Sequence, residues 1–499
     1  MSKHFCKRAW WLTLLSHCAA SLVLAGSVTQ ALHAQTLLAP GDDRLRSDLE
    51  LLADNRVIDL PLSTWPIPLD MLTDALASAR EPAAEDLALQ AALIRIQNLV
   101  QERETERSLR AGASLSDHPT RLRTFDDTPR TGSGASIAAT QVEEHWDGTL
   151  QVTLAGAPQD GQVLRFDGSY LQAPVGNWLV GAYAVDRWWG PGWDGSLILS
   201  NAGRPIPGLG ISRRTAAKPA TRWLRWLGNW NATMNVGKLD DRTDIASPEF
   251  FGMRATIKPT PWLEMGASRT LILCGAGVHC TWKEWLNKID EQQDRTSSAA
   301  YPSKQLAGWD ARLNSPWRAV PAALYAQLIG ADAVGGFPDD YFALYGAEVW
   351  HALPAGALLR AHLEWANTTC RYYQDYPRYY CAYADNQYFQ GYRYRGFPIG
   401  DSLDEDAEVV SARAEVTLAD GQSWTLMGRE GALNRNPFGD PENSLTPVRE
   451  QIKELVVGWR KLFGDHDISF GIGALHANQP TLDVTSNSLE AYVTWSRRL

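Results

Sequence analysis

The feature that most constrains the fold is a repeated alternation of polar and apolar residues from residue 108 onward. In Gly148–Leu154, for example, Leu150, Val152 and Leu154 recur at every second position. Successive side chains of a β-strand point to opposite faces, so each such run predicts a strand with one apolar face. Comparable runs are Asn177–Val185, 321–328, Leu359–Trp365, Val416–Leu426, Leu455–Trp459, Ile468–Ala474 and Leu489–Trp495.

The length and number of these runs favour a transmembrane β-barrel over a soluble β-sandwich or propeller. Runs of about ten residues, separated by turns such as Ala419-Asp420-Gly421, are typical of barrels whose strands alternate between lipid and lumen. A sandwich would use shorter strands, and a propeller would show a regular repeat, which this sequence lacks. Closure into a barrel also leaves no unpaired strand edges in lipid. We therefore predict an all-β transmembrane barrel over residues 108–499.

The tryptophans and the last predicted strand both bear on this barrel. Outer-membrane barrels carry aromatic girdles at the two membrane interfaces. The last run alternates well, although Arg497 and Leu499 depart from the aromatic ending that is usual for such proteins. The tryptophans that lie near predicted strand ends, and that we expect in the girdles, are Trp178, Trp262, Trp365, Trp424 and Trp459.

Residues 35–107 show a helical periodicity instead of a two-residue one. Asp42 or Asp43 precedes the first apolar stripe and is in position to cap a helix. Three short amphipathic helices bury little surface alone, so we predict a small bundle that docks on the barrel. The three stripes are Leu45, Leu49 and Leu52; Leu69, Leu72 and Leu76; and Leu87, Ala91 and Ile94.

The first 34 residues resemble a secretory signal peptide. Lys3, Lys7 and Arg8 form a basic start, and the apolar stretch 9–26 follows, interrupted by polar residues. Small residues then permit cleavage near Ala31 or Ala34. A transmembrane anchor is the alternative, but the apolar run is divided and no stop-transfer flank follows it. We therefore predict residues 1–34 to be a signal peptide and the protein to be exported.

Export gives the remaining cysteines an oxidising environment. Four cysteines allow three pairings, and their close spacing favours two local loops, Cys274–Cys280 and Cys370–Cys381. Free thiols or a metal site are the alternative, and His279 beside Cys280 gives little support for zinc. We predict two disulfides and no cofactor or metal.

Composition and motifs argue against several function classes. The net charge is −10 and the sequence has no basic stripe, so we expect no nucleic-acid partner. No Gly-x-Ser-x-Gly, His-Glu-x-x-His or phosphate loop occurs, so we predict a protein that is not an enzyme. The acidic cluster Asp401, Asp404, Glu405 and Asp406 does not match an EF-hand, and we interpret it as a solvated acidic loop, with calcium binding as the alternative.

Two aromatic segments are candidates for carbohydrate binding. The first spans Asp186–Leu197 and combines tryptophans with glycines, and the second spans 371–397 and is rich in tyrosine. Flat aromatic faces pack against the C–H faces of sugars, and arginines pair with acidic sugars. The candidate contact residues are Arg187, Trp188, Trp189, Trp193, Asp194, Arg371, Tyr372, Tyr373, Tyr379, Tyr380, Tyr392 and Arg393.

Both segments also have a purely structural interpretation. In the first, glycines that permit an unusual backbone would let the tryptophans pack beneath them in a turn. In the second, the tyrosines would order an extracellular loop or belong to an interface girdle without binding a ligand. The sequence leaves both interpretations open for each segment.

Several blocks, taken in order, resemble the Wzi capsule-assembly family of surface lectins. They run through nearly all of the chain after the signal peptide, which makes the set far more specific than any one block. The blocks are Asp43–Leu49, Asp54–Ile58, Leu62–Pro66, Trp188–Gly192, Gly195–Ile198, Trp223–Trp226, Leu263–Arg269, Gln305–Gly308 and Gly396–Asp401.

This resemblance implies an outer-membrane barrel of eighteen antiparallel strands with a periplasmic helical bundle. It also implies a lectin-like role in attaching exported capsular polysaccharide or exopolysaccharide to the cell surface. The alternatives are a porin or polysaccharide export pore, which needs an open lumen, and a glycan-acting enzyme, which needs a close catalytic pair in the lumen. The other partners we expect are outer-membrane lipid and the barrel-assembly machinery, and we expect a monomer.

Overall fold

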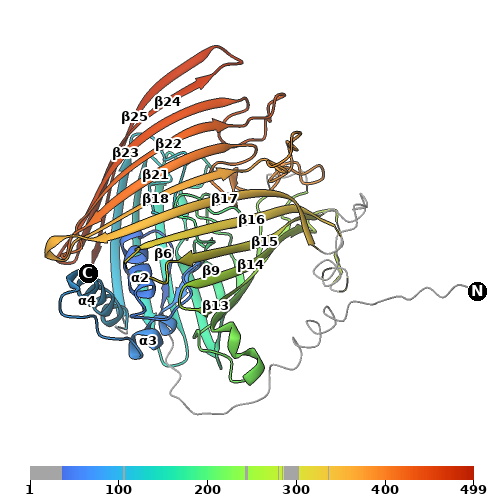
Figure 1. Cartoon of the computed structure of the whole chain (residues 1–499). Coiled ribbons are helices and arrows are strands. Elements are labelled where there is room, and N and C mark those ends of the chain that lie inside the picture. The colour runs from blue at the N-terminus through green and yellow to red at the C-terminus, as the bar shows by residue number, and fades with distance from the viewer. Residues whose placement is uncertain are drawn as a thin grey trace, which may run out of the picture.

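The computed structural model describes residues 36–499 apart from 105–106, 242–244, 279, 282, 284, 286–302, 318 and 335–336. The predicted signal peptide, residues 1–34, lies outside the described residues. The rest forms a closed antiparallel barrel with helices at one end (Figure 1). Among the described residues, no helix is both long enough and apolar enough to cross a membrane.

The barrel closes where its last strand pairs with its first, through Tyr492↔Ser116 to Arg498↔Arg110. Segments β7 and β8 both pair with β6 and together occupy one strand position, which gives eighteen strands as expected. The wall consists of β4 (Arg107–Ser116), β5 (Ser133–Val142), β6 (Asp147–Gly156), β7 (Leu164–Arg165), β8 (Ser169–Val175), β9 (Trp178–Ala184), β11 (Gly208–Arg213), β12 (Asn229–Lys238), β13 (Glu249–Thr260), β14 (Leu263–Leu273), β15 (Ser303–Asn314), β16 (Ala322–Val334), β17 (Phe337–Ala352), β18 (Leu358–Asn367), β21 (Glu408–Thr417), β22 (Ser423–Leu433), β23 (Glu450–Phe463), β24 (His466–Gln479) and β25 (Val484–Arg498).

The outer wall shows why the alternating runs form strands. Leu426, Val457 and Ile472 lie beside one another on β22, β23 and β24, and all three are exposed on the outer face. Trp424 and Trp459 form a cross-strand pair on the same face, near the turn that joins β21 and β22. Apolar side chains therefore cover the outside of the wall, and the alternate positions face inward.

The two ends of the barrel differ in the length of their connections. At one end the strands are joined mainly by short turns, such as 261–262 and 464–465. At the other end most connections are long, and the longest are 185–207, 274–302 and 368–407. We call these the short-turn end and the long-loop end.

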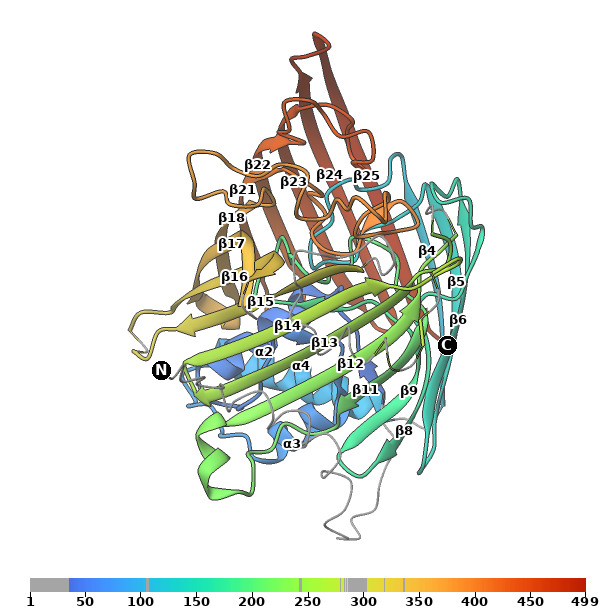
Figure 2. The same ribbon diagram turned by 90° about the vertical axis from the view of Figure 1, so that its right-hand side faces the viewer.

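Three helices precede the barrel, as the apolar stripes predicted. They are α2 (Asp43–Asp54), α3 (Leu69–Ala77) and α4 (Leu87–Arg103), and Asp42 caps α2 by accepting from the Arg44 and Leu45 amides. They lie at the short-turn end, where Arg95 of α4 donates to the carbonyls of Leu418 and Ala419. Figure 2 shows α2 and α4 behind the wall formed by β11 to β14.

The predicted apolar face of the third helix is wrong. Leu87 and Ile94 are exposed, whereas Ala88, Ala92, Ile96 and Val100 are buried. Helix α4 packs on α2, and its Ala92, Ile96 and Val100 belong to the same buried cluster as Leu49 and Leu52 of α2. The buried face of α4 is therefore set by the contact with its partner and not by its largest apolar side chains.

Candidate functional site

The first aromatic segment joins the helical region to the barrel. Its strand β10 (Trp188–Trp189) pairs with β2 (Thr64–Trp65), which follows α2 in the chain. Gly190 donates its amide to the Ser63 carbonyl, and a positive φ of 152° at this position suits glycine. Trp188, Trp189 and Trp193 are all buried. The segment therefore lies inside the barrel, with the tryptophans packed beneath their glycines.

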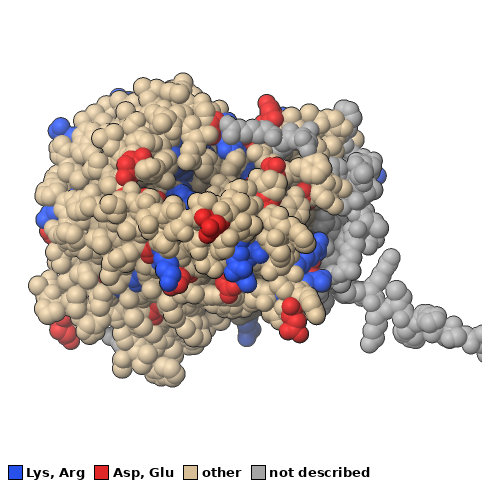
Figure 3. All heavy atoms as spheres, turned by 90° about the horizontal axis from the view of Figure 1, so that it is seen from above, with Lys and Arg blue, Asp and Glu red and all other residues tan. Residues whose placement is uncertain are grey.

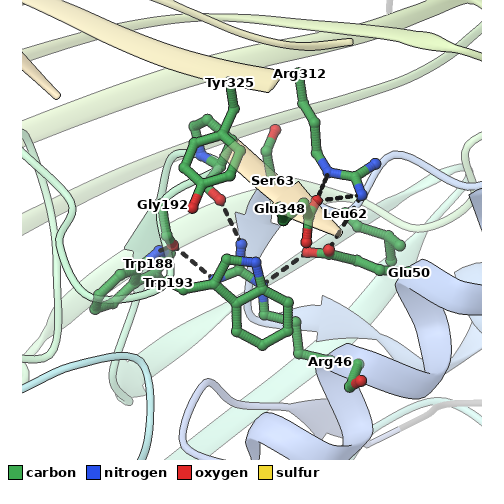
Figure 4. Close-up of polar contacts among 12 residues, drawn as sticks. Arg46, Glu50, Leu62, Ser63, Trp188, Gly192, Trp193, Arg312, Tyr325 and Glu348 are labelled. Carbon is green, nitrogen blue, oxygen red and sulfur yellow. Dashed lines mark hydrogen bonds and ion pairs between the residues drawn. The ribbon is translucent and has the colours of Figure 1, made fainter. Parts of the chain in front are cut away.

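Arg46 of α2 contacts this segment from the side of the helices. Its guanidinium lies 4.1 Å from the centroid of the Trp193 ring and donates to the carbonyls of Pro191 and Gly192 at 2.6 and 2.7 Å. Trp188 donates its indole N–H to the same Gly192 carbonyl (Figure 4). Phe125 packs edge-on against Trp65 and Trp188. These contacts bury Trp193 to 3% exposure, so its face is covered on the helix side.

A network of ion pairs fastens α2 to the inner wall. Arg312 of β15 binds Asp54 at 2.7 Å and Glu348 of β17 at 2.5 Å, and it reaches toward Glu50 (Figure 4). Arg360 of β18 pairs with Glu348 at 2.8 Å. All of these carboxylates are nearly inaccessible to solvent. Paired, hydrogen-bonded charges of this kind dock the helix in a defined orientation inside the lumen.

The wall also binds the other side of the tryptophan segment. Glu364 of β18 accepts from the amides of Trp193 and Asp194, and Asp194 contacts His362 at 3.1 Å and Ser411 at 2.7 Å. Burial opposes ionisation of Asp194, but His362 holds the pKa of that carboxyl well below its usual range. Ser411 donates to the carboxylate and not to the imidazole, unlike a nucleophile paired with its base. These groups anchor the segment to the wall.

Arg187 occupies a separate position at the start of this segment. Its guanidinium lies 5.6 Å from the Tyr183 ring centroid, and burial lowers its pKa to about 10. It lines a very small hollow together with Thr64 and Trp65. Arg187 is therefore enclosed at the junction of the wall and the helical region.

The second aromatic segment belongs to the connection 368–407 between β18 and β21, at the long-loop end. The predicted disulfides are confirmed: Cys370 bonds to Cys381 within this connection, and Cys274 bonds to Cys280 within the connection after β14. The first of these bonds closes a loop over 370–381, which we call the tyrosine loop. Its ends are also joined where Arg378 donates its amide to the Cys370 carbonyl.

The acidic cluster is buried, so the prediction of a solvated acidic loop is wrong. Glu405 accepts from the amides of Cys381, Tyr383 and Ala384, and Asp406 accepts from the amide of Tyr380. Burial, and then the neighbouring Glu405, raise the pKa of Asp406 to about 8. The carboxylates satisfy backbone amides that the irregular connection would otherwise leave without partners. Among the described residues, no group of acidic, histidine or cysteine side chains is arranged to hold a metal.

The inner half of the second segment is packed against the first. Tyr392 is fully buried and donates its hydroxyl to the Ile198 carbonyl, and Tyr383 does the same to Leu197. Arg393 is also buried and binds Asp404 at 2.7 Å. These residues form an aromatic core between the two connections at the long-loop end of the lumen.

The tyrosine loop carries the exposed aromatic residues. Tyr373 and Tyr380 are exposed, and Tyr376 is 89% exposed. Arg371 and Arg378 both bind the buried carboxylate of Asp340, at the β17 side of the loop. Tyr372 is partly buried against the outer wall, with its hydroxyl 2.7 Å from that of Tyr345 and its ring against Trp365. Tyr379 is partly buried as well.

The candidate contact residues thus form two groups that the fold separates. Arg371, Tyr372, Tyr373, Tyr379 and Tyr380 gather on one closed loop, whereas the remaining seven lie inside the barrel or in its packed core. The sequence reasoning did not identify Tyr376 as a contact residue, although it is the most exposed tyrosine of the loop. Its position between the two paired cysteines was the available signal.

Comparison with known proteins supports the same fold. The model of the capsule assembly protein Wzi family matches residues 100–489. The chain is 28% identical over 451 residues to an uncharacterized 55.8 kDa protein in the cps region of Klebsiella pneumoniae, covering 89% of this chain and 86% of that protein.

A solved structure extends the comparison from sequence to fold. It is Wzi of Escherichia coli, described as an outer-membrane protein involved in group 1 capsule assembly and as a carbohydrate-binding β-barrel. The two structures superpose with a TM-score of 0.81 at 26% identity, covering 92% of this chain and 98% of the other. The family match, which spans most of the barrel, and this superposition agree: the chain is an outer-membrane β-barrel that belongs to the Wzi family of capsule assembly proteins.

Proposed function

We propose that this protein attaches exported capsular polysaccharide or exopolysaccharide to the cell surface, and that it does so by binding and not by catalysis. The observation that carries the proposal is the tyrosine loop, a disulfide-closed loop with exposed aromatic rings on a barrel of a capsule-assembly family. Rigid aromatic faces and nearby arginines suit sugar rings and acidic groups. A polymer repeats its contacts, so weak individual contacts sum to firm retention.

The orientation follows from the two ends of the barrel. Outer-membrane barrels have short periplasmic turns and longer extracellular loops. By this rule the helical region, residues 35–107, faces the periplasm and the tyrosine loop faces the outside. Residues 1–34 act as the signal peptide, the barrel-assembly machinery inserts the chain, and membrane lipid covers the apolar outer wall of a monomer.

A filled lumen favours binding over transport. Helix α2 and the segment 186–199 occupy the inside of the wall, and they are held there by Arg46, Arg312 and Arg360. Tyr383 and Tyr392, in the aromatic core between the two connections, cover the lumen at the long-loop end. A general porin or an export pore needs a continuous water-filled path, which these packed residues oppose.

Direct binding tests the proposal. Purified full-length protein is immobilised, and the polysaccharide isolated from the strain that carries this gene is passed over it. We expect wild-type protein to bind, and the double variant Tyr373→Ala/Tyr376→Ala to bind roughly tenfold more weakly, because two exposed rings are lost.

The matched control is Trp317→Ala, which removes an aromatic ring of 70% exposure from a turn at the opposite end of the barrel. This variant should bind as the wild type does. Failure of the wild-type protein to bind the polymer contradicts the proposed function. Equal loss in both variants contradicts the assignment to the tyrosine loop.

A further inference from the structure

A second feature of the long-loop end is a cavity of about 240 Å³ whose wall is unusually rich in arginine. Five of its fourteen lining residues are arginines, and none of these fourteen described residues is acidic. The cavity is close to the ~300 Å³ at which small-molecule sites begin, so it suits one sugar residue better than a long segment. We call it the arginine cavity; its arginines are Arg121, Arg123, Arg130, Arg165 and Arg204.

The arginines are held in place by carboxylates that lie behind the cavity wall. Arg204 binds Asp160 at 2.6 Å and Asp167 at 2.7 Å, and Arg165 binds Asp160 at 2.9 Å. Asp160 is completely buried, so its charge is directed at the guanidiniums and not at the cavity. Such pairing fixes the planar guanidinium groups before a ligand arrives.

Some hydrogen-bond donors at this wall remain available. Arg121 uses its two terminal nitrogens for Glu450 and the Leu445 carbonyl, and Arg165 uses Nε and Nη2 for Gln162 and Asp160. Within the described part of the chain, Arg121 Nε and Arg165 Nη1 have no hydrogen-bond partner. A carboxylate is the group that guanidinium donors bind best, because its two oxygens match their spacing.

The electrostatics of the loop arginines also favour an anion. Burial, and then the neighbouring Arg130, lower the pKa of Arg123 to about 10. At Arg130 burial has the same effect, but the neighbouring Asp186 and Asp127 outweigh it and raise the pKa. Arg123 is therefore the guanidinium that a negative group placed nearby would stabilise most, because such a group offsets its repulsion by Arg130. A neutral ligand would leave the repulsion unchanged.

Part of the remaining wall is apolar, and two of its apolar residues come from the connection that carries the tyrosine loop. Phe397 and Pro398 come from this connection, and Leu445 lies on the loop after β22. An aromatic ring beside charged donors suits a sugar, whose C–H face packs on the ring while its acidic group meets the arginines.

We propose that the arginine cavity binds a carboxylate-bearing sugar residue of the polysaccharide, and so selects acidic polymers. The inference rests on the proposed function and deepens it, because it names the chemical class of the sugar. The connection 368–407 contributes to the cavity wall and also contains the tyrosine loop, so one polymer can contact both the arginine cavity and the tyrosine loop.

The test compares the strain's purified polysaccharide with the same polymer after chemical reduction of its carboxyl groups, on full-length protein. We expect reduction to weaken binding at least tenfold, since charge-assisted hydrogen bonds are lost. Arg121→Gln should weaken binding of the intact polymer about tenfold and leave binding of the reduced polymer unchanged. Arg121→Lys keeps the charge but loses the two-pronged guanidinium group, so its binding of the intact polymer should lie between that of the wild type and that of Arg121→Gln.

Arg435→Gln is the matched control, because its side chain is 27% exposed where that of Arg121 is 31%. In both variants the carboxylate partner keeps a second donor: Gln479 for Glu450, and Trp365 for Glu408. Arg435→Gln should bind both polymers as wild type does. The heat-dependent mobility of the folded barrel in gels confirms that each variant is folded.

The outcomes separate the two proposals. Equal binding of intact and reduced polymer, or binding of a polymer that has no carboxyl groups, overturns the acidic-sugar inference and leaves the proposed function standing. An Arg121→Gln loss that is equal for both polymers also overturns it. If neither polymer binds to wild-type protein, the proposed function itself fails and the inference falls with it.

Discussion

The guanidinium of Arg46 lies 4.1 Å from the ring centroid of Trp193 and joins the first helix to the segment that crosses the barrel lumen. The same arginine binds Glu50 at 2.8 Å and two backbone carbonyls, and it is almost completely buried. This contact connects the helical region to the segment inside the barrel, so both the order of the helices and the filling of the lumen depend on it.

Arg46→Ala should loosen the helical region without unfolding the wall. The change removes a buried ion pair and one donor from each of the two carbonyls, of which that of Gly192 keeps the Trp188 indole N–H, a loss of about 3–5 kcal/mol. Limited trypsin digestion should then cut within residues 36–104 much faster than in the wild type, while the barrel keeps its folded mobility in gels. Arg56→Ala, at an exposed arginine of the same region, serves as the control and should not change the digestion. Unchanged digestion of Arg46→Ala would show that Arg46 does not hold the helices.

The filled lumen predicts a small ion conductance. Reconstituted wild-type protein in a planar bilayer should pass little current for a barrel of this size, because α2 and the segment 186–199 occupy the lumen. Arg46→Ala should raise the conductance by freeing part of this space. A large and steady wild-type conductance would support the porin alternative instead.

The Cys370–Cys381 disulfide should stabilise the tyrosine loop locally. A closed loop of this length restrains the unfolded ensemble by about 3 kcal/mol. In the variant Cys370→Ser/Cys381→Ser we expect faster proteolysis between these positions and weaker polysaccharide binding, with an unchanged melting temperature of the barrel. The corresponding variant Cys274→Ser/Cys280→Ser should leave polysaccharide binding intact. Full binding without the Cys370–Cys381 bond would mean that the order of the loop is unimportant.

The tyrosine loop should become less stable as pH rises. Asp406 lies outside the loop but accepts from the amide of Tyr380 within it. The pKa of Asp406 is about 8 in the folded protein and 3.8 for an ordinary aspartate, so the folded state retains a proton that is released when this contact opens. Its stabilising effect is therefore complete below about pH 4 and is lost as pH rises through about 8. Proteinase K cleavage of the loop, relative to an unfolded peptide substrate, should be faster at about pH 9 than at about pH 5.

Asp406→Asn keeps an acceptor for the Tyr380 amide but cannot ionise. In this variant the difference between the two pH values should shrink. A pH dependence as large as that of the wild type would assign the effect to another group.

The strands and the first helix could be predicted because their signals are local. The alternation in Gly148–Leu154 reappears as β6, and the Asp42 cap lies one residue before α2, as expected. The face of α4 was predicted wrongly for a different reason. Ala92 and Ile96 are buried with residues of α2, and the sequence pattern within α4 contains no information about that contact.

The two aromatic segments show why the candidate site could be predicted only in part. Tryptophans among glycines suit both a sugar platform and a packed turn, and the partner of Trp188 is Trp65, more than a hundred residues away. The arginine cavity could not be predicted because its lining comes from five separate stretches of sequence and shares no periodicity. Its five arginines lie outside both aromatic segments, and no local pattern links them.

Surface retention of polysaccharide tests the central claim most directly. Cell-attached and released polymer are measured in a strain that lacks this gene and in the same strain complemented with it, with total synthesis as the control. If the account is correct, total polymer is unchanged and shifts from the cells into the medium when the gene is absent. Normal attachment without the gene, or a fall in total synthesis that accounts for the loss, would contradict it.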